Sequence, residues 1–158
     1  MAQTLISPLA QIDPEAQIGT EVTIGPFVTI EANTVVGDRT ILDQGCMIRS
    51  GARIGSDCHI HPYAVIAGIP QDLKFKGEET TAVIGDHTTI REFATVNRGT
   101  ASRGTTVVGS NCLIMAYSHV AHDCILKDHI ILGNATQLAG EVEIDDYAIL
   151  SGAVLVHQ

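Results

Sequence analysis

A repeat of six residues runs through almost the whole chain, from Ile12 to Val156. Every sixth position in this range is Ile, Leu or Val, except at Asp72, Glu78 and Ser102. A period of six fits neither an α-helix, which repeats every 3.6 residues or so, nor the two-residue alternation of an ordinary strand. It is typical of hexapeptide β-helices, in which each hexad forms one flat side of a coil. The repeat therefore predicts an all-β fold, a three-sided prism of parallel strands with 18 residues per coil.

A second inward position follows four residues after each large aliphatic, and it is usually small or β-branched. All four cysteines of the chain occupy it: Cys46, Cys58, Cys112 and Cys124. Free cysteine is among the most buried residue types, and none of the four has the Cys-x-x-Cys spacing of a metal site. We therefore expect four buried thiols rather than disulfides or metal ligands.

Two segments, residues 68–82 and 98–106, interrupt the repeat without shifting its phase. Both are expected to be loops that leave the prism and rejoin it in register, and long loops in a regular fold commonly carry function. The segments and the stretch between them hold Lys74, Lys76, Arg91, Arg98 and Arg103. This local positive charge suggests an anionic ligand or an acidic partner, although solvated loop charge is an equally good explanation.

The composition excludes several classes of protein. The net charge of −9 argues against nucleic acid as a partner. No apolar run approaches the length of a membrane-spanning helix and no signal-peptide pattern precedes the repeat, so we expect neither membrane insertion nor secretion, and a cytoplasmic location. The 158 residues form a single predicted domain. The last hexad stops in phase without a capping segment, which suggests a piece of a longer protein.

Seven histidines are present, and none falls in an inward position. For each of them an ordinary surface role stays open. His122 stands out because Gly140 lies one 18-residue coil above it. An imidazole can take a proton from a hydroxyl as general base, worth about 10²–10⁴-fold, and a bare glycine amide can stabilise an oxyanion, worth about 10²–10³-fold. Together with Asp123, which can support the imidazolium, these residues suggest acyl transfer.

Four stretches carry a more specific signal: QDLKFKGE at 71–78, IRE at 90–92, RGT at 98–100 and AHDC at 121–124. In these the chain resembles the acyl-(acyl-carrier-protein)–UDP-N-acetylglucosamine O-acyltransferase (LpxA) family, which carries out the first step of lipid A biosynthesis in bacteria. The resemblance implies a left-handed β-helix and a homotrimer with sites between subunits. It also implies transfer of an (R)-3-hydroxyacyl chain from acyl carrier protein to the 3-hydroxyl of UDP-N-acetylglucosamine, without metal or cofactor.

The resemblance assigns the general base to His122, the supporting carboxylate to Asp123 and the oxyanion amide to Gly140. It assigns substrate contacts to Gln71, Asp72, Lys74, His119, His157 and Gln158. The loop at 68–82 of one subunit is then expected to reach toward the His122 face of the next. Members of the family continue into a helical C-terminal domain, and we expect this chain to end before it.

Two departures from the family pattern leave the details of substrate contact open. Glu141 stands where better-known members carry a histidine beside the oxyanion glycine. Many members read His-Arg-Gly-Thr where this chain reads Asn97-Arg98-Gly99-Thr100, so Asn97 replaces the histidine. The sequence also leaves two points undetermined: the acyl length, and whether the acceptor is the ordinary or a 3-amino sugar nucleotide.

Three alternatives remain. Another hexapeptide acyltransferase, N-acyl- or acetyl-CoA-dependent, shares the prism, but the QDLK and AHDC stretches argue against it. A γ-class carbonic anhydrase needs three zinc-binding histidines, and Tyr117 occupies the position where one partner of His122 would stand. A non-catalytic structural β-helix leaves the two in-register loops unexplained.

Overall fold

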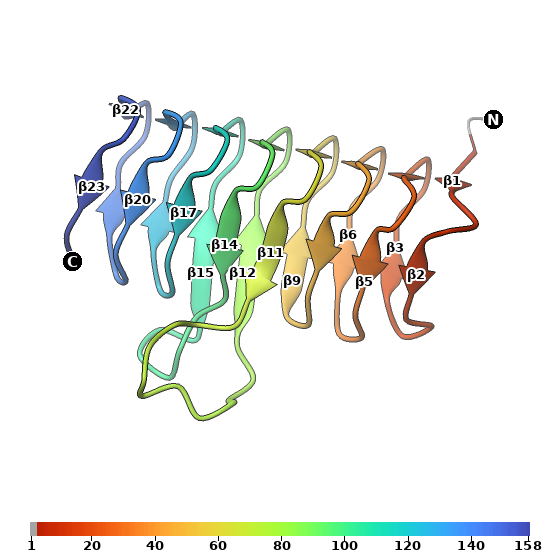
Figure 1. The fold of residues 1–158 in the computed structure, drawn as a ribbon, viewed down its shortest axis with the longest axis horizontal. Helices are drawn as coiled ribbons and strands as arrows, with labels where there is room; N and C mark the ends of the chain where they lie inside the picture. Colours follow the sequence, from red (N-terminus) through yellow and green to blue (C-terminus); the bar gives the residue numbers. More distant parts are fainter. Residues whose placement is uncertain (1–2) are drawn as a thin grey trace.

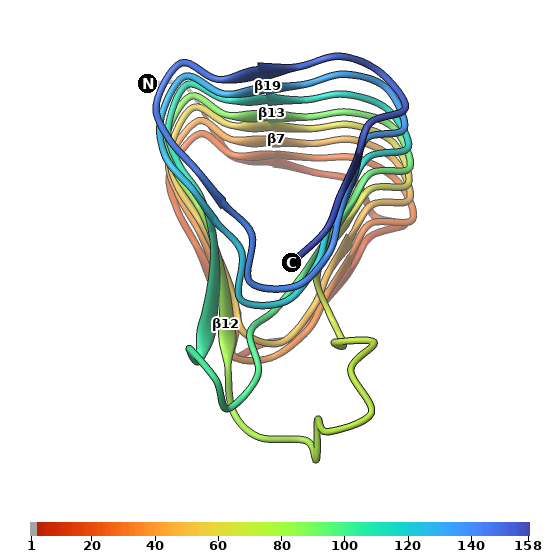
Figure 2. The ribbon, with the colours of Figure 1, turned by 90° about the vertical axis from the view of Figure 1, so that its left-hand side faces the viewer.

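The computed structural model describes residues 3–158 and confirms the prism. The chain winds as a left-handed parallel β-helix of 23 short strands, and each coil adds one strand to each side (Figure 1). Seen along its axis, the molecule is triangular, with successive coils stacked on one another (Figure 2). Within residues 3–158, no helix is long and apolar enough to cross a membrane.

Each side of the prism is one parallel sheet. The first side contains β1 (Leu5–Ile6), β4 (Thr23–Ile24), β7 (Ile41–Leu42), β10 (His59–Ile60), β13 (Thr89–Ile90), β16 (Leu113–Ile114), β19 (Ile131–Leu132) and β22 (Ile149–Leu150). The second side contains β2 (Gln11–Ile12), β5 (Thr29–Ile30), β8 (Met47–Ile48), β11 (Val65–Gly68), β14 (Thr95–Asn97), β17 (His119–Val120), β20 (Gln137–Leu138) and β23 (Leu155–Val156). The third side contains β3 (Gln17–Ile18), β6 (Val35–Val36), β9 (Ala52–Ile54), β12 (Thr81–Ile84), β15 (Thr105–Val108), β18 (Ile125–Leu126) and β21 (Glu143–Ile144).

The aliphatic positions of the repeat form the core. Ile90, for example, pairs with Ile60 below it and Ile114 above it, and all three are completely buried. The four cysteines are free and buried, as expected. Burial raises the pKa of the Cys46 thiol to about 12, so this thiol stays protonated and packs as a small apolar group.

The corners of the prism share one local geometry. Most turn through a residue in the left-handed region, such as Asp123 and Glu141 with φ of 61° and 63°. The second residue after each core aliphatic is proline at Pro14, Pro26 and Pro62. Proline has no N–H, so this corner position needs no backbone hydrogen bond from its own amide. His122 and Gly140 occupy the same position in later coils.

Both interruptions leave the prism at the corner between the second and third sides, where they project from one vertex of the triangle (Figure 2). The loops comprise residues 69–80 and 98–104 and are shorter than predicted. The reason is that β12 and β15 begin early, with Thr81 paired to Thr105 and Ala82 to Thr106. This longer parallel ladder holds the bases of the two loops together.

Candidate active site

His122 and Asp123 form a hydrogen-bonded pair at the corner between β17 and β18. His122 Nδ1 lies 2.8 Å from Asp123 Oδ2. The aspartate is completely buried, and the histidine side chain is 17% exposed. An ionised carboxylate only accepts hydrogen bonds, so it keeps the proton of a neutral imidazole on Nδ1. The lone pair of His122 Nε2 is then free to act as a base.

Hydrogen bonds from the 98–104 loop hold the Asp123 carboxylate. The Thr100 amide donates to Oδ1 at 3.0 Å, the Thr100 hydroxyl to Oδ2 at 2.6 Å, and the Arg103 amide to Oδ1 at 3.1 Å. Burial alone raises the pKa of Asp123, but hydrogen bonds from Thr100, His122 and Arg103 outweigh it and hold that pKa below its usual value. The carboxylate is therefore ionised at neutral pH.

Thr100 and Arg103 were not among the predicted site residues. Thr100 contacts Asp123 across 23 residues of sequence, and Arg103 does so across 20. Neither separation is a multiple of the coil length, because the 98–104 loop adds residues outside the repeat. The RGT motif at 98–100 includes Thr100, but the sequence assigned it no contact with Asp123.

Gly140 lies directly above His122, as the coil length predicts. A Cβ atom on this glycine would lie 2.5 Å from His122 Cε1 and 2.6 Å from Nε2, so the imidazole packs where a side chain would be. Gly140 occupies the corner position that is proline elsewhere, and within residues 3–158 no backbone acceptor receives its N–H. This amide is available to donate a hydrogen bond beside the Nε2 base.

A pocket of about 480 Å³ opens in front of His122. It is lined by Gln71, Asp72, Leu73, Lys74, His122, Glu141 and Gln158. Asp72 Oδ2 lies 4.0 Å from His122 Nε2 in the same chain. The loop at 69–80 thus lines the pocket of the histidine of its own chain. Its reach toward the His122 face of the next subunit stays a prediction.

The other two predicted substrate contacts lie along the second side of the prism, outside this pocket. His119 on β17 is half-buried, with Nδ1 2.7 Å from Thr95 Oγ1. Burial lowers its pKa, and the proximity of His122 lowers it further. His157 lines a separate pocket of about 350 Å³ between β20 and β23. Both histidines therefore lie outside the His122 pocket, and their contacts with substrate stay predictions.

The two departures from the family pattern have different surroundings. Glu141 lies at the mouth of the His122 pocket, where its Oε1 accepts a hydrogen bond from Ser102 Oγ at 2.9 Å. It therefore ties the coil above the base to the 98–104 loop. Asn97 ends β14 and is only 5% exposed, so it contributes to the base of the loops rather than to the pocket surface.

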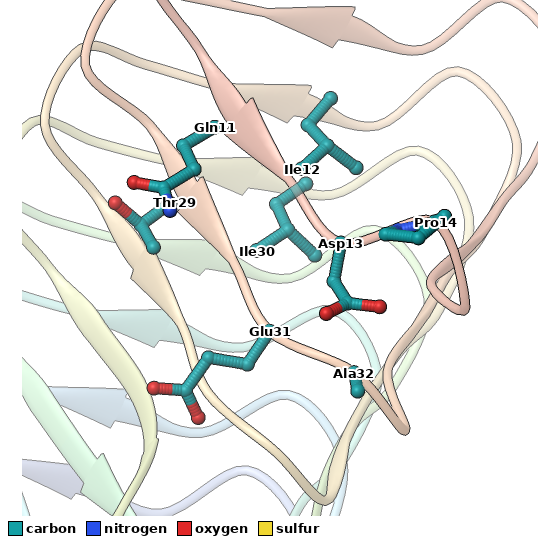
Figure 3. Close-up of a pocket in the computed structure, with 8 residues that line it drawn as sticks. All are labelled: Gln11, Ile12, Asp13, Pro14, Thr29, Ile30, Glu31 and Ala32. Carbon is teal, nitrogen blue, oxygen red and sulfur yellow. The ribbon is translucent and has the colours of Figure 1, made fainter.

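Figure 3 shows a different pocket, of about 300 Å³, on the first coils. It is lined by Gln11, Ile12, Asp13, Pro14, Thr29, Ile30, Glu31 and Ala32. Its carboxylates are those of Asp13 and Glu31, and Glu31 is already bound by Arg49 Nε and the Ser50 amide. With no histidine in its lining, this pocket offers no general base comparable to His122.

Comparison with known proteins supports the assignment of the fold and the family. Residues 1–107 match the family model described as GMPPB C-terminal domain, and residues 105–140 match Bacterial transferase hexapeptide (six repeats). The acyl-[acyl-carrier-protein]–UDP-N-acetylglucosamine O-acyltransferase of Campylobacter concisus is 49% identical over 108 residues, which are 67% of this chain and 41% of that protein. The Pseudomonas savastanoi protein of the same name is 52% identical over 100 residues, 63% of this chain and 39% of that protein.

Solved structures give the same result over nearly the whole chain. LpxA from Bacteroides fragilis is 55% identical with a TM-score of 0.97, covering 98% of this chain and 60% of that one. The chain belongs to the LpxA family. LpxA from Acinetobacter baumannii is 40% identical with a TM-score of 0.96, over the same shares of the two chains. Because its residues 1–107 match that family model, the chain also belongs to the GMPPB C-terminal domain family.

The chain spans about two fifths of the length of the curated relatives it matches. A GDP-perosamine N-acetyltransferase from Caulobacter crescentus is only 18% identical, with a TM-score of 0.59 over 95% of this chain and 53% of that one. That likeness shows the fold alone.

Proposed function

We propose that this chain is the β-helical part of an acyltransferase that moves an (R)-3-hydroxyacyl chain from acyl carrier protein to the 3-hydroxyl of UDP-N-acetylglucosamine. The observation that supports this most strongly is the arrangement around His122. Its Nδ1 is bonded to a buried carboxylate, and its Nε2 faces a pocket beside the free amide of Gly140. The LpxA relatives support the choice of donor and acceptor.

The proposed reaction needs one base and one oxyanion donor. His122 Nε2 takes the proton of the sugar hydroxyl as the oxygen attacks the thioester carbonyl carbon. Asp123 stabilises the resulting imidazolium, while the Gly140 amide donates to the carbonyl oxygen as it gains negative charge. The tetrahedral intermediate then collapses, the carbon–sulfur bond breaks, and the carrier-protein thiolate receives the proton from Nε2. No metal or cofactor takes part in these steps.

The loop at 69–80 supplies three of the binding groups of this proposal: Gln71, Asp72 and Lys74. Lys74 lines the His122 pocket and offers the positive charge that a nucleotide diphosphate requires. Asp72, Gln71 and Gln158 offer acceptors and donors to the sugar hydroxyls, and His119 and His157 extend the contact surface along the second side. The proposal includes a homotrimer in the bacterial cytoplasm, with acyl carrier protein as its transient partner.

The test is transfer of a radiolabelled 3-hydroxyacyl group from acyl carrier protein to UDP-N-acetylglucosamine. We would compare this chain, the full product of its gene and the His122→Ala variant of each. The exposed His129 on another corner provides the control, His129→Ala. We expect His122→Ala to lower kcat by about 10³-fold with unchanged sedimentation, and His129→Ala to retain activity.

Two results would contradict this proposal. Absence of transfer by the full gene product, over a range of acyl lengths, would exclude the reaction. Loss of the assembly in His122→Ala would instead give this histidine a structural role.

A further inference from the structure

A second cluster of titratable side chains lies on the first side of the prism and shares no residue with the candidate active site. His59 and His61 flank Ile60 at the end of β10, and Asp43 follows β7 one coil earlier. Alternate residues of a strand point to the same face. Because Ile60 is completely buried in the core, the two histidines share the outer face. Their rings stack with centroids 3.9 Å apart.

The nitrogen and oxygen atoms of this cluster converge. His59 Nε2 lies 2.7 Å from Asp43 Oδ2, and His61 Nδ1 lies 3.9 Å from the same oxygen. One ligand atom from each of the three residues can be chosen so that all lie within 4.8 Å of one another. Bonds of about 2.0–2.2 Å to a tetrahedral zinc ion place its ligand atoms roughly 3.4 Å apart. The observed distances bracket that value. The two stacked rings, 22° from parallel, would turn on binding so that both nitrogens point at the ion.

We propose that His59, His61 and Asp43 form a binding site for a divalent transition-metal ion, with Zn²⁺ as the best fit. Two imidazoles and one carboxylate are a donor set that zinc accepts, and the fourth position stays open to water. The His-x-His arrangement on a single strand presents both rings before the ion arrives. The side chains are 36%, 19% and 37% exposed for His59, His61 and Asp43, so an ion can reach them from solvent.

The surrounding charges favour a cation at this place. Within residues 3–158, Asp43 forms ion pairs only with the two histidines, so no lysine or arginine competes for its carboxylate. Glu92 Oε1 lies 3.6 Å from His61 Nδ1 and adds a second negative charge nearby. Arg91 binds both oxygens of Glu92, at 3.0 and 3.2 Å, and its positive charge offsets that of Glu92, so Asp43 supplies the main attraction for a cation.

A bound ion would connect two successive coils. The Asp43 amide donates to Ile60 O at 2.9 Å, and the His61 amide donates to Ile90 O at 2.8 Å, so the ligands stand on a hydrogen-bonded ladder. A metal bound only in the folded state stabilises it by mass action. We therefore expect Zn²⁺ to raise the melting temperature. The site shares no residue with the His122 pocket and does not depend on the proposed function.

The test uses the untagged chain, with Zn²⁺ titrated by calorimetry and Co²⁺ binding followed by visible absorption. We expect one equivalent of ion, tetrahedral Co²⁺ bands and a higher melting temperature. Loss of an outer-shell partner typically weakens metal binding about 10–100-fold. Loss of a direct ligand in His59→Gln or Asp43→Asn should therefore lower the affinity for Zn²⁺ by about tenfold or more.

The matched controls are His129→Gln, an exposed histidine on another corner, and His122→Gln. Both should bind as the unchanged chain does, and far-UV circular dichroism verifies that each variant is folded. The proposal is overturned if the unchanged chain binds no ion. It is also overturned if His59→Gln and Asp43→Asn bind normally, or if only His122→Gln loses the ion.

Discussion

Gly140 is the residue at which one added methyl group would most directly disturb the candidate base. A Cβ there would lie 2.5 Å from His122 Cε1, closer than non-bonded carbons approach. In Gly140→Ala we expect the imidazole to move away from the corner, and kcat to fall by about 10²-fold because a displaced base and amide no longer face the same atom. Steady-state kinetics measure this, and an unchanged kcat would show that His122 reacts without the space that Gly140 leaves.

Thr100 supports the buried Asp123 through its hydroxyl. Thr100→Val keeps the shape but removes that donor, so we expect the free energy of unfolding to fall by ~1.5–3 kcal/mol at pH 7. The control is Thr105→Val, which removes a hydroxyl bonded to another hydroxyl, that of Thr81, and should cost less.

The effect of Thr100→Val should depend on pH. The pKa of Asp123 is lowered in the folded chain, so its contribution to stability is present above its ordinary value of about 3.9 and is lost as the pH falls through the lower folded value. Urea denaturation of the unchanged chain and of Thr100→Val should therefore show a difference in the free energy of unfolding that is largest near neutral pH and shrinks in acid. A difference that does not change with pH would contradict this role.

At the scale of elements, the two loops act as one unit. Glu78 Oε1 accepts a hydrogen bond from the Ala101 amide at 3.0 Å, and the Arg98 guanidinium lies 5.4 Å from the centre of the Phe75 ring. These contacts link residues 69–80 to residues 98–104, beyond the shared β12–β15 ladder. The position of Asp72 and Lys74 in front of His122 thus depends on contacts at the base of the loops.

Glu78→Ala should loosen this pairing. We expect faster amide hydrogen exchange in residues 69–80 and a KM for the sugar nucleotide several-fold higher, with a smaller effect on kcat, because the proposed function gives Lys74 a role in binding and His122 a role in the reaction. Glu79→Ala is the matched control, since this neighbouring glutamate is exposed. Equal exchange rates in both variants would show that the loops are held by other contacts.

At the scale of the whole molecule, stability is distributed along the axis, because each coil packs only on its neighbours. Ile90→Ala opens a cavity between fully packed coils, and we expect a loss of ~2–5 kcal/mol in the free energy of unfolding. Leu150→Ala, at a partly buried position near the last coil, should cost less than half as much. Chemical denaturation of the two variants measures the difference, and equal losses would contradict a graded core.

The sequence by itself determined the prism and the stacking of equivalent corner positions in successive coils. Inward positions recur every six residues, so the period predicts the sheets, the buried cysteines and the placement of Gly140 above His122. Each of these features follows from regular backbone, in which position along the chain sets position in space.

Only the tertiary structure decided the contacts that cross from irregular segments to the coils. Thr100 and Arg103 reach Asp123, and Asp72 reaches His122 of its own chain, through loops whose paths no repeat describes. The convergence of Asp43 with the two histidines required side-chain directions as well as register. The physical reason is the same in each case. A loop's course and a rotamer are chosen by contacts between residues distant in sequence, whereas a repeat specifies only the neighbours one coil away.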